Sequence, residues 1–270
     1  MLIPNSLRME HMPKMVYALV KLVESNRYTE NDLRKIITAT TRNEYDDSSW
    51  DRFNLIHNFA CEAEMISEKN GYYITEFTGK QLTSFSEFTY ALLGKMTVHK
   101  DNMFDALLKC YLKSDYYIES EFTTSASKYR EKAIEDVNVK RFHVEEDNIH
   151  GFFFWIEAFE IANFESNRSG HVYYCLENLL IKYIERHPEL KQKGSLPTKL
   201  FIEELTQDLY FIPFCCEGNN ITYPLSQALR ILENMEMIDL EYRQDSDQIW
   251  HLTNSEAFVK GNRFSNVRVH

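Results

Sequence analysis

The chain has 270 residues and a net charge of −11 at pH 7; 44% of its residues are hydrophobic, 14% are aromatic, and only 8 are Gly and 6 are Pro. This apolar content excludes disorder as the main state, and the scarcity of Gly and Pro argues against an all-β barrel or a glycine-dependent nucleotide fold. The acidic balance argues against a protein that acts mainly through nonspecific phosphate contacts, because such contacts need cations. The net charge is −1 over residues 1–100, −6 over 101–170 and −4 over 171–270.

The first forty residues predict two helices. Apolar residues recur at helical spacing over 13–25, and Pro13 suits the first turn of a helix. Thr29 and Asp32 resemble a capping box, in which the side chain of each residue bonds to the backbone of the other. A second short helix is therefore expected to begin there.

A third helix and a hairpin are expected next. The polar stretch 42–47 predicts a loop, after which Ser48 or Ser49 caps a longer helix with an apolar stripe. Two short β-forming runs within 65–75 flank an Asn-Gly pair, which is a strong signal for a tight hairpin. Three helices and a hairpin in this order predict a winged helix-turn-helix, in which the hairpin closes a core that three short helices leave open.

The same order is repeated near the C-terminus. Helices are expected over 172–186, 198–209 and 222–236. Strands are expected over 236–242 and 248–253, with a polar turn between them. These elements predict a second winged helix.

Between the two copies the sequence predicts a helical middle region, whose broad apolar stripes indicate burial against more than one neighbour. Its helices are expected over 85–96, 102–112, 125–137 and 147–165. The predicted fold class is mainly α with short β-hairpins (α+β), with two winged helix-turn-helix units flanking the middle region. The expected divisions are an N-terminal winged helix at 1–97, the middle region at 98–170, a C-terminal winged helix at 171–259 and a flexible tail at 260–270.

No motif for catalysis, a cofactor or a metal stands out. The sequence lacks a P-loop, an HExxH motif, a GxSxG motif and a dinucleotide fingerprint. The stretch 143–150 combines two His with three acidic residues, but its spacing fixes no common ligand face, so a solvated acidic loop is the preferred interpretation. We therefore expect a protein that is not an enzyme and holds no cofactor and no metal.

The cysteines and the apolar runs bear on location. The 5 cysteines are odd in number, have no CxxC spacing and lie mostly among apolar neighbours, which is typical of a reducing compartment. The first residues show no charged leader before an apolar core, and the longest apolar runs fall far short of the roughly 20 residues that cross a bilayer. A cytoplasmic protein without a membrane partner is expected.

The N-terminal copy offers the surface on which DNA contact is expected, although the sequence leaves direct contact open. In DNA-binding winged helices the third helix enters the major groove and the wing lies over phosphates. The candidate DNA contacts are Arg52, Asn54, His57, Asn58, Lys69, Asn70 and Tyr72. The third helix of the C-terminal copy carries a single cation, Arg230, and its wing is acidic. That copy is therefore expected to bind protein or to be structural.

The two copies share two short sequence matches. After the third helix, Met65-Ile66 corresponds to Met237-Ile238, and in the second wing strand Ile74-Thr75 corresponds to Leu252-Thr253. With this element order, residues 13–80 and 172–254 resemble the tandem winged-helix accessory subunits of SMC-type ATPase complexes, the KITE and MukE-like proteins. The resemblance implies a subunit that pairs, holds a partner chain and adds modest DNA contact, while another polypeptide hydrolyses ATP. The long helical insert departs from the simplest pattern of that family.

Similar middle subunits occur in bacterial anti-plasmid and anti-phage SMC-like systems. The resemblance therefore implies a non-enzymatic scaffold or adaptor subunit of a multiprotein, SMC-like complex that acts on DNA in antiviral or anti-plasmid defence. Its implied protein partners are an SMC-like ATPase and a nuclease subunit, and DNA binding by the chain alone would be weak. The alternative is a winged-helix DNA-binding transcription regulator, which would dimerise and bind one operator tightly in isolation. An enzyme with an unrecognised site is the third alternative.

Overall fold

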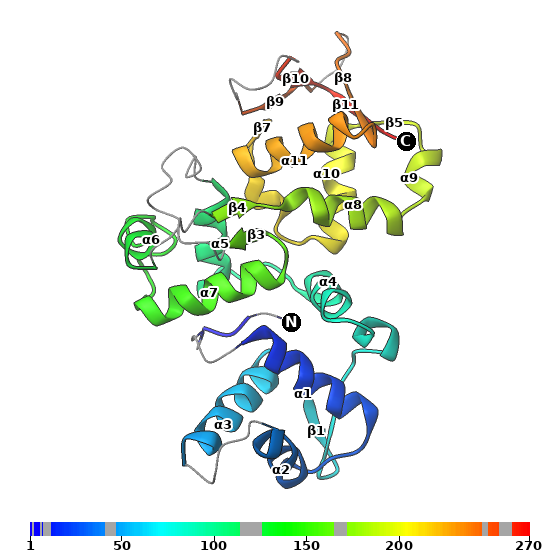
Figure 1. Ribbon diagram of the computed structural model, residues 1–270. Helices are drawn as coiled ribbons and strands as arrows, with labels where there is room; N and C mark the ends of the chain where they lie inside the picture. Colours follow the sequence, from blue (N-terminus) through cyan, green and yellow to red (C-terminus); the bar gives the residue numbers. More distant parts are fainter. Residues whose placement is uncertain are drawn as a thin grey trace. The chain divides into compact units, whose positions relative to one another are not determined.

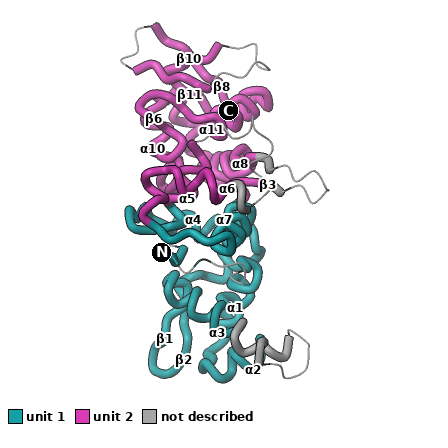
Figure 2. The backbone as a smooth tube through the Cα atoms, turned by 90° about the vertical axis from the view of Figure 1, so that its left-hand side faces the viewer, with its two compact units in different colours: residues 1–105, 142–159 teal, residues 106–141, 160–270 magenta. Residues whose placement is uncertain are grey.

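The computed structural model describes residues 1, 3–5, 7, 12–40, 47–113, 126–164, 172–244, 248–253 and 261–270, without the side chains at 38–40, 47–52, 126–128, 164 and 172–173. The described residues form helices and small sheets, and the fold class is α+β, as expected (Figure 1). The chain divides into two compact units (Figure 2). Unit 1 is Met1–Asp105 with Phe142–Phe159, and unit 2 is Ala106–Arg141 with Glu160–His270.

Unit 1 begins with three helices, α1 (Pro13–Ser25), α2 (Glu30–Thr40) and α3 (Asp47–Glu62), in the predicted order. Thr29 N donates to Asp32 Oδ2 at 3.1 Å, and Asp32 N donates to Thr29 Oγ1 at 3.3 Å, which confirms the predicted capping box at the start of α2. The loop expected before α3 lies outside the described residues except for its last residue, which begins α3, and so do the side chains of the two serines expected to cap that helix.

The predicted hairpin follows α3. Its strands, β1 (Ser67–Lys69) and β2 (Tyr72–Ile74), pair antiparallel. The two residues that join them, Asn70 and Gly71, have φ of 56° and 80°, the left-handed values that a two-residue type I′ turn requires. Tyr73 N also donates to the carbonyl of Tyr28 at 3.0 Å. A residue between α1 and α2 therefore forms a bridge to the outer edge of β2.

Two further helices belong wholly to unit 1. These are α4 (Phe85–Lys95), which follows the 3-10 helix η1 (Gly79–Leu82), and α7 (Glu146–Ala158). The indole of Trp155 on α7 stacks on the ring of Phe59 on α3, with centroids 5.4 Å apart and ring planes at 16°. A helix from far along the chain therefore completes the core of the N-terminal unit.

Unit 2 contains a second set of helices and strands. Its helices are the end of α5 (Met103–Lys113), α6 (Ala126–Ala133), α8 (Leu176–Arg186), α9 (Glu189–Gln192), α10 (Thr198–Asp208), η3 (Ile212–Cys215) and α11 (Tyr223–Asn234). Its strands are β3 (Ala162–Phe164), β4 (Val172–Tyr174), β5 (Ser195–Pro197), β6 (Cys216–Glu217), β7 (Asn220–Ile221), β8 (Ile238–Glu241), β9 (Trp250–Leu252), β10 (Arg263–Phe264) and β11 (Asn266–Val269).

One sheet of unit 2 repeats the strand order of unit 1. Strand β11 lies between β5 and β8 and is antiparallel to both. β5 precedes α10 as Tyr28 precedes α2, and β8 follows α11 as β1 follows α3. In both units the returning strand, β11 or β2, therefore pairs with the segment before the second helix on one side and with the strand after the third helix on the other.

Unit 2 also contains a second, four-stranded sheet. Two of its strands, β6 and β7, precede α11 in the chain, and the other two, β9 and β10, lie between β8 and β11. Its order is β10-β9-β7-β6, with β9 parallel to β7 and antiparallel to β10. Leu252 N, at the end of β9, donates to Asn262 O, just before β10, at 2.8 Å. This bond joins the two ends of the segment between β9 and β10.

Two expected helices are wrong at their ends. The helix expected over 147–165 ends at Ala158, Glu160 adopts a left-handed φ of 58°, and residues 162–164 form β3. The helix expected over 172–186 begins at Leu176, because residues 172–174 form β4, which pairs with β3. Val-Tyr-Tyr is a β-branched and aromatic run, which favours a strand over the first turn of a helix.

The C-terminal hairpin and the tail also differ from expectation. Residues 248–253 contain the expected strand, β9, but it pairs with β7 and β10 instead of β8. The partner of β8 is β11, in which Val267 and Val269 are buried. The prediction of a flexible tail at 260–270 is therefore wrong for the described residues of that segment. The residues 98–170 expected as a middle region are divided between the two units.

Candidate functional site

The candidate contacts on α3 have different surroundings. Asn58 is exposed, and Asn54 is half-buried and accepts a hydrogen bond from Arg34 Nη2 of α2 at 3.4 Å. The same Arg34 nitrogen pairs with Glu30 Oε1 at 2.6 Å. Arg52 belongs to α3, but its side chain lies outside the described residues. On this helix, the structure therefore places Asn58 on the open surface and Asn54 at its margin.

His57 was expected to point outward, and this is wrong. Its side chain is buried, with 7% exposure, stacked on Phe53 at 5.3 Å and against the edge of Tyr73 at 4.8 Å between ring centroids. Because Phe53 is four residues before His57 and Tyr73 lies on β2, the imidazole packs between the helix and the hairpin. His57 therefore helps to hold the hairpin against α3 and is not available to DNA.

The three candidate contacts on the hairpin are exposed. Lys69 and Asn70 lie at its turn, and Tyr72 is 42% exposed at the start of β2. Lys69 and Tyr72 are cross-strand partners, so their side chains lie on the same face. Glu68, one residue before Lys69, is also exposed and lies on the opposite face. The tip of the hairpin therefore carries one cation beside one anion.

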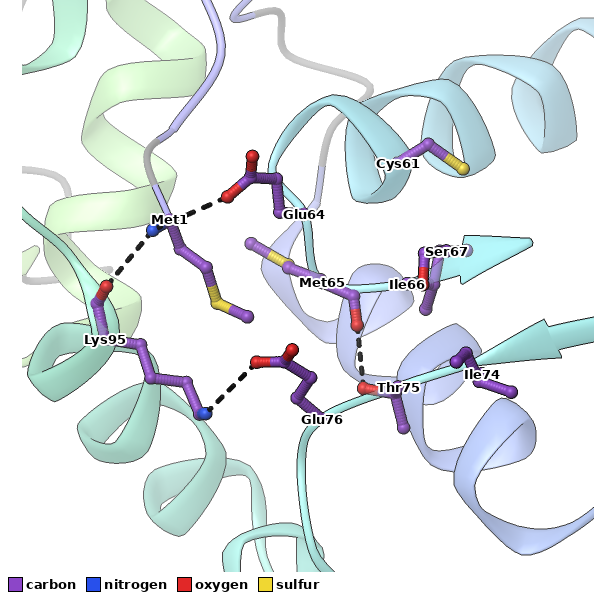
Figure 3. Close-up of a pocket in the computed structure, with 10 residues that line it drawn as sticks. All are labelled: Met1, Cys61, Glu64, Met65, Ile66, Ser67, Ile74, Thr75, Glu76 and Lys95. Carbon is purple, nitrogen blue, oxygen red and sulfur yellow. Dashed lines mark hydrogen bonds and ion pairs between the residues drawn. The ribbon is translucent and has the colours of Figure 1, made fainter. Parts of the chain in front are cut away.

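A pocket that the sequence did not indicate lies at the base of the hairpin, with a volume of about 530 Å³. Its lining residues are Met1, Cys61, Glu64, Met65, Ile66, Ser67, Ile74, Thr75, Glu76 and Lys95. The Thr75 hydroxyl donates to Met65 O at 2.7 Å, which closes the base of the hairpin, and the side chains of Met1, Met65 and Glu76 point toward the middle of the pocket (Figure 3). The hairpin and α4 thus share one concave surface.

The lining of this pocket carries two carboxylates and two cations, and the carboxylates are the more exposed charges. The side chains of Glu64 and Glu76 are 79% and 82% exposed. Lys95 Nζ lies 4.0 Å from Glu76 Oε2 and 5.4 Å from the centroid of the Phe77 ring. The Met1 nitrogen donates to Lys95 O at 3.2 Å and lies 3.9 Å from Glu64 Oε2 (Figure 3). Both carboxylates therefore remain largely open to solvent.

Cys61, which also lines the pocket, is not an activated nucleophile. Burial, followed by the nearby charges of Glu30, Glu62 and Glu68, raises the pKa of the Cys61 thiol to about 11. The thiol is therefore protonated at neutral pH, and a protonated thiol is a poor nucleophile and a poor metal ligand.

The corresponding helix of unit 2, α11, is covered. Arg230, noted in the sequence as the single cation of this helix, is 4% exposed, and its Nη2 donates to Asn262 Oδ1 at 2.6 Å. Ser226 Oγ accepts from Thr253 N at 2.9 Å. Both contacts join α11 to the chain at the ends of β9 and β10, so the second sheet lies against this helix. Burial lowers the pKa of Arg230, although not enough to discharge a guanidinium at neutral pH.

The acidic stretch at 143–150 does not gather into a metal-binding group. His143 Nε2 lies 3.2 Å from Glu145 Oε1, and both side chains are exposed. Within the described residues, no three His, Cys, Asp or Glu side chains are placed to share a metal ion. In the same part of the chain, no helix has the length and apolar character needed to span a membrane.

Comparisons with known proteins add no family to these observations. No protein-family model, curated protein or solved structure matches the chain.

Proposed function

We propose that the protein is a non-enzymatic scaffold subunit of a multiprotein complex that acts on DNA, and that each of its units contains a winged helix-turn-helix. The observation that carries the proposal is the shared strand order. In each unit the segment before the second helix pairs with the returning strand, which pairs with the strand after the third helix. We take this shared pairing as support for three helices and a hairpin that fold around one core in each unit, which is the arrangement of a winged helix.

The two winged helices have different tasks in this proposal. Unit 1 leaves Asn58 of α3 and the tip of the hairpin exposed, with Lys69 and Asn70 there to meet phosphates or a partner chain. In unit 2 the second sheet lies against α11, and Arg230 is buried. A covered helix cannot enter a DNA groove, so unit 2 serves as a structural or protein-binding module.

The scaffold has an SMC-like ATPase and a nuclease subunit as partners in this proposal, in a cytoplasmic anti-plasmid or antiviral defence system. Its own DNA contact is weak, because few exposed cations lie among the described residues of the surface that would face phosphates. A transcription regulator would need a third helix open to the major groove in each DNA-binding unit. Only α3 is a candidate for that role among the described helices, which favours the scaffold.

The test compares DNA binding with complex formation. The purified full chain is titrated onto an unrelated duplex and onto duplexes selected from a random pool, at about 50 and about 200 mM salt. We expect weak binding without sequence preference that is lost at the higher salt. Isolation of the chain from its native cells at its normal level should bring an ATPase subunit with it. Tight binding to one selected sequence by the chain alone would refute the scaffold and support the regulator.

A further inference from the structure

The open face of the hairpin in unit 1 continues into the pocket at its base. Ser67 pairs with Ile74 and Lys69 with Tyr72, so these four side chains share one face, opposite the buried Tyr73. Tyr72 is 42% and Ile74 is 40% exposed. Ser67 and Ile74 also line the pocket. An apolar surface on the hairpin therefore leads directly into the concave surface beneath it.

The outer edge of β1 has backbone groups that face away from β2. In a hairpin with a two-residue turn the closing pair is hydrogen-bonded and the next pair is not, so the backbone groups of Glu68 and Tyr73 point outward. Those of Tyr73 meet Tyr28 at 3.0 Å. Within the described residues, β1 pairs with β2 alone. An extended chain can therefore add as a strand along β1.

The charge of the pocket selects what can bind there. Two carboxylates, Glu64 and Glu76, are largely exposed in the lining. The two cations near them, the Met1 ammonium and Lys95, belong to residues whose side chains are only 6% and 28% exposed, so an incoming chain meets the carboxylates first. Exposed carboxylates attract a cationic side chain and repel a phosphate backbone. The small Ser67 side chain leaves room on the hairpin face between an added strand and Ile74.

We propose that β1 and the pocket dock an extended segment of a partner protein that adds as a strand beside β1. Alternate side chains of this segment are apolar and cover the face of Tyr72 and Ile74, and a Lys or Arg side chain reaches the carboxylates of Glu64 and Glu76. This inference rests on the proposed function and names the chemistry of the partner segment and the surface that receives it.

The test uses random peptides of about twelve residues, long enough to follow the hairpin edge and the pocket. They are displayed on phage and selected on the full chain, and the selected sequences are then measured as free peptides by fluorescence anisotropy. We expect apolar residues at alternate positions with a Lys or Arg among them. The Glu64→Lys, Glu76→Lys double variant should weaken binding about ten-fold or more, since it replaces attraction by repulsion. Glu62→Lys, an exposed glutamate of α3 outside the pocket, should change binding less than about two-fold.

A second measurement reports the added strand itself. Hydrogen exchange at the Glu68 amide should slow when the peptide binds, because a strand bond replaces a bond to water. The inference is overturned by failure to select any peptide, by selection of acidic peptides, by equal binding to the double variant, or by displacement of the peptide by duplex DNA. Selection of a sequence from this chain itself would assign the surface to a second copy and also overturn it. Failure here leaves co-purification with an ATPase subunit intact, whereas operator-specific DNA binding would refute the scaffold without removing the peptide site.

Discussion

The third helices of the two units, α3 and α11, have the same place in the strand order and different surroundings. α3 has Asn58 on the open surface, and in unit 1 the two strands after it are joined by a two-residue turn. After α11 the chain leaves the hairpin at the end of β8, forms β9 and β10 against that helix, and only then returns as β11. The length of chain between the two hairpin strands therefore decides whether the third helix is open or covered.

The charges follow the same division. Arg230 has its guanidinium buried and bound to Asn262, whereas Lys69 extends from the tip of the hairpin. A buried cation supports packing, and an exposed cation is available to a partner. Two copies of one arrangement can therefore serve different purposes in a single chain.

The largest expected effect tests whether the core of unit 1 depends on α7. Trp155→Ala removes a fully buried indole that stacks on Phe59, and a cavity of this size costs about 3–5 kcal/mol. Trp155→Phe should cost about 1–2 kcal/mol, because the indole N–H makes no hydrogen bond to a described residue and only part of the ring is lost. Urea unfolding with hydrogen exchange should show the loss in α3 and α7. An equal loss of protection in α11 would mean that the two units unfold together.

The next largest effect is expected at Arg230, and it tests whether this residue holds β9 and β10 against α11. Arg230→Ala removes the hydrogen bond to Asn262 and the packed side-chain stem, which should cost about 1–3 kcal/mol. Hydrogen exchange should quicken in β9 and β10, while α11, which packs against α8, keeps its protection. Arg243→Ala is the matched control, since that arginine is more than half exposed and its loss should cost less than about 1 kcal/mol. Unchanged exchange in β9 and β10 would show that other contacts hold the second sheet.

The sequence predicted the local elements of the fold well. The Asn-Gly pair correctly predicted the hairpin, because both residues accept the left-handed backbone that its turn requires. The Thr29–Asp32 box correctly predicted the start of α2, because both of its hydrogen bonds between side chain and backbone lie within four residues. Signals of this kind depend on neighbours in the chain and not on tertiary packing.

What the sequence missed depends on pairing between distant segments. Val267 and Val269 alternate with Arg268, a pattern that predicts a strand, but nothing local indicates that its partners are β5 and β8. The burial of His57 is an exception that local spacing does indicate, because His57 falls four residues after Phe53 and three before Ala60, on the buried face of the helix. The pocket joins a hairpin to the end of a helix about twenty residues later, a proximity that only tertiary packing creates.

A smaller expected effect is that the stability of unit 2 depends on pH through His187. His187, after α8, bonds through Nδ1 to Glu189 at 2.8 Å and through Nε2 to Asp208 at 3.1 Å. Burial opposes its ionisation, but the hydrogen bonds and charges of Asp208 and Glu189 outweigh burial and raise the pKa of His187 above its usual 6.5. A raised pKa in the folded state means that the charged imidazole stabilises unit 2 at low pH, and that this stability is lost as pH rises through the folded pKa.

The variant His187→Gln should therefore be less stable than the parent chain at about pH 5.5, by about 1 kcal/mol, and the difference should shrink by about pH 8.5. Urea midpoints at each pH measure it, with hydrogen exchange of α8 and α10 to locate it in unit 2. His143→Gln is the matched control, because His143 and its partner Glu145 are exposed. A difference that grows with pH would mean that the neutral imidazole is the form that stabilises the fold.

The smallest expected effect tests the open surface of unit 1 directly. Lys69→Glu reverses the cation at the hairpin tip, so weak DNA binding at low salt should fall about three-fold and its dependence on salt should become less steep. Arg263→Glu makes the same change at an exposed position of β10 in unit 2 and should leave DNA binding within about two-fold. Both variants should keep their stability within about 0.5 kcal/mol, because both side chains are exposed. Titration of a fluorescent duplex at several salt concentrations measures both. If Arg263→Glu weakens DNA binding as much as Lys69→Glu does, the DNA contact is spread over both units and the separation of their tasks is wrong.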